Sequence, residues 1–176
     1  FYDFYKNKMI FLDAKPNKAH LKLAEMEQAG KLSAIVTQNI DGLHQAAGSK
    51  NVFELHGSVH RNYCQKCGKF FDVNYVVNAK GVPYCDECGG IIKPDVVLYE
   101  EGLDSQTING AVRAISKADM LIIGGTSLVV YPAAGMIDYF KGKYLAVLNR
   151  DATSRDKQAD LCITDPIGEV LGRIRV

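Results

Sequence analysis

Residues 118–125 read Ala-Asp-Met-Leu-Ile-Ile-Gly-Gly, and this stretch is the most persuasive candidate for a central strand of the chain. A short apolar run that ends in two glycines predicts a buried strand whose end leaves room for a ligand. Helices are expected on both sides of it, over about 105–117 and 133–140, with further strands at 144–149 and near 161–163. Strands that alternate with helices in this way predict an α/β fold with a parallel sheet.

The first hundred residues continue this alternation. Apolar residues at helical spacing predict an amphipathic helix from about Ala19 to Ala29. The β-branched runs Ser33–Thr37 and Val52–Leu55 predict two short buried strands, and strand character returns at Val96–Tyr99.

Length and composition describe a globular chain. Its 176 residues are 47% hydrophobic and 23% charged, and the formal net charge is +1. This balance excludes the disordered and collagen-like classes and provides no basic field for nucleic acid or an anionic membrane. No apolar run approaches the roughly 20 residues that a membrane-spanning helix needs. We therefore expect a soluble, cytoplasmic protein with neither a specific nucleic-acid partner nor a membrane partner.

Four of the five cysteines form two Cys-x-x-Cys pairs. Cys64 and Cys67 are followed, after 17 intervening residues, by Cys85 and Cys88. This spacing predicts a zinc ribbon in which four thiolates close the tetrahedron, so that one structural zinc is bound with no open position for water. Buried free thiols or a redox pair remain the alternative. The fifth cysteine, Cys162, lies in a predicted strand and is expected to be a small core residue.

Polar side chains follow the strand that ends at Thr37. Gln38, Asn39 and Asp41 stand directly after it, and in open α/β sheets ligands bind at the carboxyl ends of the strands. This placement favours a binding loop for a polar small molecule. The alternative is a hydrogen-bonded loop in which Asp41 caps a helix.

Two further segments occupy similar positions. His56 follows the strand that ends at Leu55, and imidazole exchanges a proton near neutral pH, although a lone histidine is more often structural. Residues 124–128 and Asn149 also follow predicted strands, where small and polar residues can approach a nucleotide. Residues 124–128 do not match the dinucleotide fingerprint or the P-loop, so this signal is weak alone.

Taken together, these segments resemble the sirtuins, which are NAD-dependent protein lysine deacylases. The resemblance runs from Lys15 to the C-terminus and rests on the order and joint presence of six motifs: residues 14–20, 37–44, 55–57, the four cysteines, 93–97 and 125–133. It implies a Rossmann-like parallel sheet with an inserted small zinc-ribbon domain, and an active site in the cleft between them.

The implied domain organisation has three segments. Residues 1–60 form the first part of the Rossmann-like domain, with a remnant of a helical module near residues 1–14. Residues 61–92 form the zinc-ribbon domain, and residues 93–176 complete the Rossmann-like domain.

The resemblance also implies a role for each candidate residue. His56 is the catalytic base, and NAD is the co-substrate whose nicotinamide is released when the acyl group passes from lysine to ADP-ribose. Residues expected to contact NAD are Gln38, Asn39, Asp41, Gly125, Thr126, Ser127, Asn149 and Ile167. Residues expected to accept the acylated peptide as an added strand are Val96, Val97, Leu98 and Tyr99.

Two departures from the sirtuin pattern bear on activity. Glu100 stands where sirtuins usually carry a glycine. The Gly-Ala-Gly turn and cofactor loop with which the family opens are missing before Phe1. We therefore expect the 176 residues alone to bind NAD weakly and to turn over slowly, whereas the intact enzyme is a deacylase.

Three other functions remain open. A mono-ADP-ribosyltransferase of the same family would break the same first bond. A non-enzymatic zinc-ribbon module is disfavoured because the chain lacks a basic stripe with interleaved aromatic residues. A nicotinamide-dependent dehydrogenase is disfavoured because these residues contain no G-x-G-x-x-G turn.

Overall fold

A computed structural model describes all 176 residues, which divide into two compact units. Unit 1 contains Phe1–Lys15, Gln38–Gly42 and His56–Leu103, and unit 2 contains Pro16–Thr37, Leu43–Leu55 and Asp104–Val176. None of the helices has both the length and the apolar character needed to cross a membrane.

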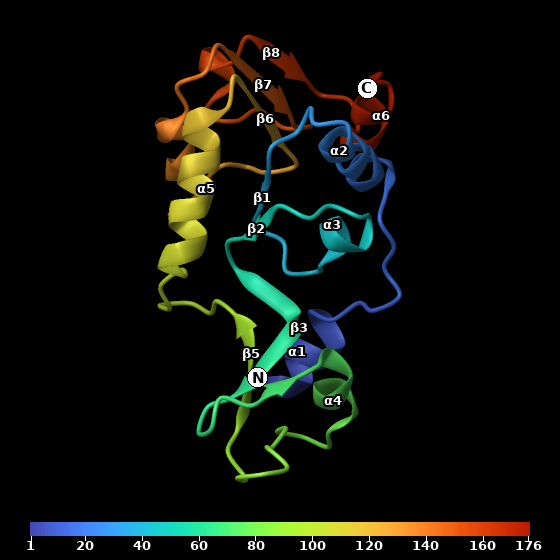
Figure 1. Cartoon of the computed structure of the whole chain (residues 1–176), viewed down its shortest axis with the longest axis vertical. Helices are drawn as coiled ribbons and strands as arrows, with labels where there is room; N and C mark the ends of the chain where they lie inside the picture. The colour runs from blue at the N-terminus through green and yellow to red at the C-terminus, as the bar shows by residue number, and fades with distance from the viewer. The chain divides into compact units, whose positions relative to one another are not determined.

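Unit 2 contains a three-stranded parallel sheet (Figure 1). Its strands are β6 (Met120–Gly124), β7 (Tyr144–Leu148) and β8 (Leu161–Ile163), in the order β6-β7-β8. The four residues Leu145–Leu148 of β7 are all buried, which explains why the central strand reads as a continuous apolar run. The predicted parallel α/β architecture is confirmed.

A second parallel pair in unit 2 joins β1 (Ile35–Thr37) to β2 (Val52–Glu54). The short helix α3 (Leu43–Ala46) lies in the connection between them. This helix has only four residues, too few for a periodic apolar pattern, and it was not predicted.

The two longer helices of unit 2 each begin after a polar residue that caps their N-terminus. The side chain of Asn17 accepts hydrogen bonds from the backbone N–H groups of Ala19 and His20 and starts α2 (Lys18–Gln28). The side chain of Asp104 accepts hydrogen bonds from the backbone N–H and the hydroxyl of Thr107, and it starts α5 (Ser105–Lys117). These two hydrogen bonds lower the pKa of Asp104. The remaining helical segments of this unit are η1 (Ala133–Tyr139), η2 (Asp156–Gln158) and α6 (Ile167–Gly172).

Unit 1 is built on a small antiparallel sheet. The long strand β3 (Gly57–Cys64) pairs with β4 (Phe70–Phe71) on one edge and with β5 (Ile92–Val96) on the other. Two helices, α1 (Tyr2–Lys8) and α4 (Val73–Asn78), complete the unit. The core residues are Tyr5, Ile10, Val59, Cys64, Phe71, Val73, Val76, Cys85, Ile92 and Val96.

Helix α1 belongs to this core although it opens the chain. The Tyr5 side chain is fully buried, which raises the pKa of its phenol, and the Tyr2 hydroxyl donates to the Ile92 carbonyl at 2.6 Å. Lys6 Nζ donates to the Ala79 carbonyl at 2.6 Å and to the Gly81 carbonyl at 2.9 Å. These contacts tie the start of the chain to the loop that precedes the second cysteine pair.

The expected domain boundaries at residues 60 and 92 differ from this division into units. Strands β3 and β5 pair from Gly57 with Val96 to Cys64 with Ile92, so the full length of both strands lies with the cysteines.

The expected strand at Val96–Tyr99 is wrong beyond its first residue. Strand β5 ends at Val96, and the N–H of Glu101 donates back to the Leu98 carbonyl in a turn. Glu100 has φ of 71° at this turn, in the left-handed region that glycine favours. The turn therefore keeps the glycine-like conformation at the position where the sirtuin pattern has glycine.

Candidate active site and metal centre

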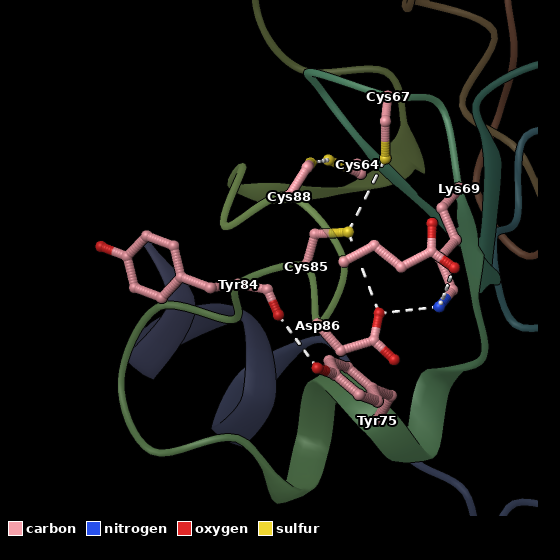
Figure 2. A network of polar contacts seen from close by, with 9 residues as sticks. Cys64, Cys67, Lys69, Tyr75, Tyr84, Cys85, Asp86 and Cys88 are labelled. Atoms are coloured by element: carbon pink, nitrogen blue, oxygen red, sulfur yellow. Dashed lines mark hydrogen bonds and ion pairs between the residues drawn. The ribbon is translucent and has the colours of Figure 1, made fainter.

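The four predicted zinc ligands converge in unit 1 (Figure 2). The Sγ atoms of Cys64, Cys67, Cys85 and Cys88 all lie within 4.8 Å of one another. Two of the separations are 3.4 Å, between Cys64 and Cys88, and 3.7 Å, between Cys67 and Cys85. A tetrahedron of sulfurs about 2.3 Å from zinc has edges of about 3.8 Å, so the donor set fits one closed structural zinc.

Each cysteine pair lies in a turn that a backbone hydrogen bond closes. The N–H of Gly68 donates to the Cys64 carbonyl, and the N–H of Gly89 donates to the Cys85 carbonyl. The backbone N–H of Cys67 donates to the sulfur of Cys64 and, with a smaller contribution from that of Lys66, lowers the pKa of the Cys64 thiol to about 6. Zinc binds thiolates, so these amides favour the form of cysteine that the metal requires.

Lys69 braces one cysteine pair against the other. Its carbonyl accepts from the Cys64 N–H at 2.9 Å, and its Nζ reaches Asp86 at 2.8 Å and Glu87 at 2.9 Å. Figure 2 shows the contact between Lys69 and Asp86. This hydrogen bond, and to a smaller extent the one to Glu87, raises the pKa of Lys69. Four thiolates and Zn²⁺ carry a net charge of −2, so two adjacent carboxylates need this cation.

Replacing Lys69 by methionine should speed zinc release to a chelator about tenfold, because the apolar stem is kept while the charge beside Asp86 and Glu87 is lost. Absorbance of the zinc complex of 4-(2-pyridylazo)resorcinol measures the rate. Lys66→Met is the matched control, since no ion pair involves its side chain. Adding Asp86→Asn and Glu87→Gln to Lys69→Met should restore slow release. Equal rates of zinc release from Lys69→Met and Lys66→Met would contradict this role of the Lys69 charge.

His56 and the loop after β1 meet within unit 1. The Nδ1 of His56 lies 3.0 Å from the Gln38 carbonyl oxygen, which can only accept, so Nδ1 carries the proton. In the neutral ring this tautomer leaves the second nitrogen, Nε2, with a free lone pair that can accept a proton. Asn39 Nδ2 donates to Asp41 Oδ2 at 3.4 Å in the same loop.

The residue after His56 must be glycine. Gly57 has φ of 76°, and a Cβ there would overlap the carbonyl oxygen of Asp95 on β5. The close approach of the two strands at this point also lets the Val97 N–H donate to the His56 carbonyl at 3.1 Å. The backbone of His56, in the turn that precedes β3, is therefore held by the segment after β5.

The four residues expected to bind peptide divide into two kinds. Val96 is buried and pairs with Gly57, and the Val97 N–H donates to the His56 carbonyl, so both lie beside the histidine. Leu98 packs partly against the core, while Tyr99 is fully exposed. The turn after them is held by Glu101, which accepts from the Leu98 N–H and from Lys93; these bonds lower the pKa of Glu101.

The other expected NAD contacts gather in unit 2, at the carboxyl ends of β6 and β7. The Gly125 N–H donates to the Leu148 carbonyl, which places the loop containing Thr126 and Ser127 next to Asn149. Ile167 packs directly over Gly124, where its Cδ1 occupies the space that a Cβ would take. The structure thus brings these five expected residues to one edge of the sheet, and it holds Gln38, Asn39 and Asp41 in unit 1.

Some sequence interpretations were wrong or incomplete. Cys162 is exposed, because β8 is an edge strand, and its Sγ lies 3.7 Å from the Asp156 carbonyl. The ion pairs of Lys69 with Asp86 and Glu87 were not predicted. The two acidic residues between Cys85 and Cys88 are the sequence signal that indicates a nearby cation. His60 contacts the loop 38–42 at the Asp41 carbonyl, and no sequence signal pairs residues 19 positions apart.

Comparisons with known proteins agree with this geometry. The Sir2 family model matches residues 1–132. The chain is 66% identical to an NAD-dependent protein deacetylase of Clostridium acetobutylicum, covering 97% of this chain and 70% of that protein. It is 64% identical to the NAD-dependent protein deacetylase of Clostridium perfringens, covering 99% and 72% respectively.

Solved structures give the same result. A structure of Sir2 with a p53 peptide and NAD+ superposes with a TM-score of 0.90 at 40% identity, over 98% of this chain and 75% of that one. A structure of Sir2 bound to an acetylated peptide superposes with a TM-score of 0.89 at 40% identity, again over 98% and 75%. Because the family model and these relatives match most of its length, the chain belongs to the Sir2 family.

Proposed function

We propose that the protein is an NAD-dependent protein lysine deacetylase that transfers the acyl group from lysine to ADP-ribose and releases nicotinamide. The observation that carries this proposal is the junction of His56 with the loop 38–42, where the Gln38 carbonyl accepts the proton of Nδ1 and leaves Nε2 as a base. Relatives at 66% and 64% identity bear the name of this activity.

In this proposal each of the candidate residues has its own role. NAD supplies an activated ribose that accepts the acyl group. Nε2 of His56 takes a proton from a ribose hydroxyl, and imidazole suits this step because it is half ionised near neutral pH. Asn39 and Asp41 line the nicotinamide site, and Gln38 contacts the ribose. Residues assigned to the adenosine and phosphate half are Gly125, Thr126, Ser127, Asn149 and Ile167.

The peptide is proposed to run beside Val96–Tyr99. The Val97 N–H donates to the His56 carbonyl, which holds this segment beside the base. A peptide strand that pairs with the segment would therefore present its acyl-lysine next to His56. Recognition through main-chain hydrogen bonds tolerates many sequences around the lysine. A cytoplasmic location is also proposed, since the four zinc ligands must remain reduced.

The test is to supply NAD and an acetyl-lysine peptide to the full natural chain that contains these residues. We expect nicotinamide, deacetylated peptide and acetyl-ADP-ribose in equal amounts, measured by liquid chromatography with mass spectrometry. Peptide or protein that gains the mass of ADP-ribose while keeping its acetyl group would indicate mono-ADP-ribosyl transfer instead. Absorbance of reduced cofactor at 340 nm would indicate a dehydrogenase.

A further inference from the structure

His56, in the turn before β3, and Val59 and His60, in β3, make three successive contacts to the backbone of the loop 38–42. His56 Nδ1 donates to the Gln38 carbonyl, the Val59 N–H donates to the Ile40 carbonyl, and His60 Nε2 donates to the Asp41 carbonyl, each at 3.0 Å. All of these residues lie in unit 1. The first of the three contacts involves the proposed base, and the last involves a histidine that the proposed chemistry does not use.

His60 also packs on the residue after Asp41. Gly42 has φ of 69°, and a Cβ placed there would lie 2.8 Å from Cδ2 of the His60 ring. The imidazole therefore covers Gly42 at the same time as it bonds the carbonyl before it. Two adjacent residues of the loop are restrained by one side chain.

The backbone of His60 is itself well anchored. Its N–H donates to the hydroxyl of Ser58 at 3.3 Å, and Ser58 is only 2% exposed. The neighbouring Val59 is 3% exposed and packs in the core of unit 1, where Ile40 joins it. The His60 ring thus extends from strand β3 and reaches a segment that contains no helix or strand of its own.

We propose that His60 is a positioning residue for the nicotinamide site: it fixes the loop 38–42 so that Asn39 and Asp41 are presented in the geometry that binds NAD. The inference rests on the proposed function, because that function gives these two residues their role. His60 does not touch NAD in this proposal. Replacing the His60 side chain should weaken the binding of NAD and nicotinamide while leaving peptide binding unchanged.

Three substitutions separate the hydrogen bond from the packing. His60→Ala removes both, His60→Phe keeps a ring over Gly42 without a donor, and His60→Gln supplies an amide donor without the ring. We expect His60→Ala and His60→Phe to raise the KM for NAD and the inhibition constant of nicotinamide about tenfold, which corresponds to about 1.4 kcal/mol. The kcat and the KM for the peptide should stay within about twofold, and His60→Gln should recover most of the NAD affinity.

Amide hydrogen exchange of residues 38–44, measured on the full natural chain without NAD, tests the restraint independently of activity. Exchange should be faster in His60→Ala than in the wild type. If exchange is unchanged, or if the KM for NAD is unchanged while exchange rises, the positioning role is overturned. If the wild type fails to deacetylate but exchange responds as expected, the proposed function fails while the restraint of the loop by His60 stands.

Discussion

Replacing His56 by alanine is expected to lower kcat/KM for deacetylation by at least about 100-fold, because the reaction loses its general base. The fold should survive, since the Val97 N–H donates to the backbone carbonyl of His56, which alanine retains. Gly57, which makes the close approach to Asp95, is also unchanged. Steady-state kinetics with an acetyl-lysine peptide, together with thermal unfolding, measure both expectations.

A second assay locates the step at which His56 acts. Exchange of labelled nicotinamide into NAD reports the first bond cleavage, whereas peptide deacetylation reports the whole reaction. In the proposed mechanism the base acts on the ribose after nicotinamide leaves, so exchange should fall much less than deacetylation in His56→Ala. An equal loss in both assays would contradict this order, and a kcat/KM within about fivefold of wild type would remove His56 from the role of base.

Elements with a clean apolar period were predictable from the sequence. Helix α5 spans Ser105–Lys117 as expected, because a polar cap residue precedes a periodic run and the helix buries only one face. Strand β8 at Leu161–Ile163 and the apolar part of β7 also lie where the sequence places them. The metal centre was predictable for another reason, since two Cys-x-x-Cys pairs at this spacing are typical of a zinc ribbon. The two pairs themselves meet where β3 pairs with β5.

Other features depend on contacts that no local pattern encodes. Strand β3 was not expected, because a register shift between Ser58 and Asn62 breaks the alternation of buried and exposed residues. The bond between His60 and Asp41 joins residues 19 positions apart, and that between Lys69 and Asp86 joins residues 17 apart. Both contacts depend on strand pairing and on the turns of the cysteine pairs, which exist only once the chain has folded.

Removing zinc should unfold unit 1 while unit 2 keeps its structure. Cys64 and Cys85 are 2% and 4% exposed and belong to the core that includes Val76 and Ile92, so the metal crosslinks the hydrophobic core itself. Structural zinc sites contribute about 10–16 kcal/mol of binding free energy. That is comparable to the roughly 5–15 kcal/mol by which whole domains are stable. We therefore expect unit 1 to unfold when it loses this contribution.

Cys64→Ser tests this, with Cys162→Ser as the matched control, because the same atom is replaced at an exposed position outside the cluster. We expect Cys64→Ser to contain less than one tenth of a zinc per chain by mass spectrometry, and the control to contain one. Hydrogen exchange should become fast in β3 and β5 but stay slow in β7, because the buried run Leu145–Leu148 packs within unit 2. Deacetylation should disappear with the fold of unit 1, since His56 and the loop 38–42 lie there. Slow exchange of β3 in a zinc-free Cys64→Ser protein would show that the antiparallel sheet holds this unit without its metal.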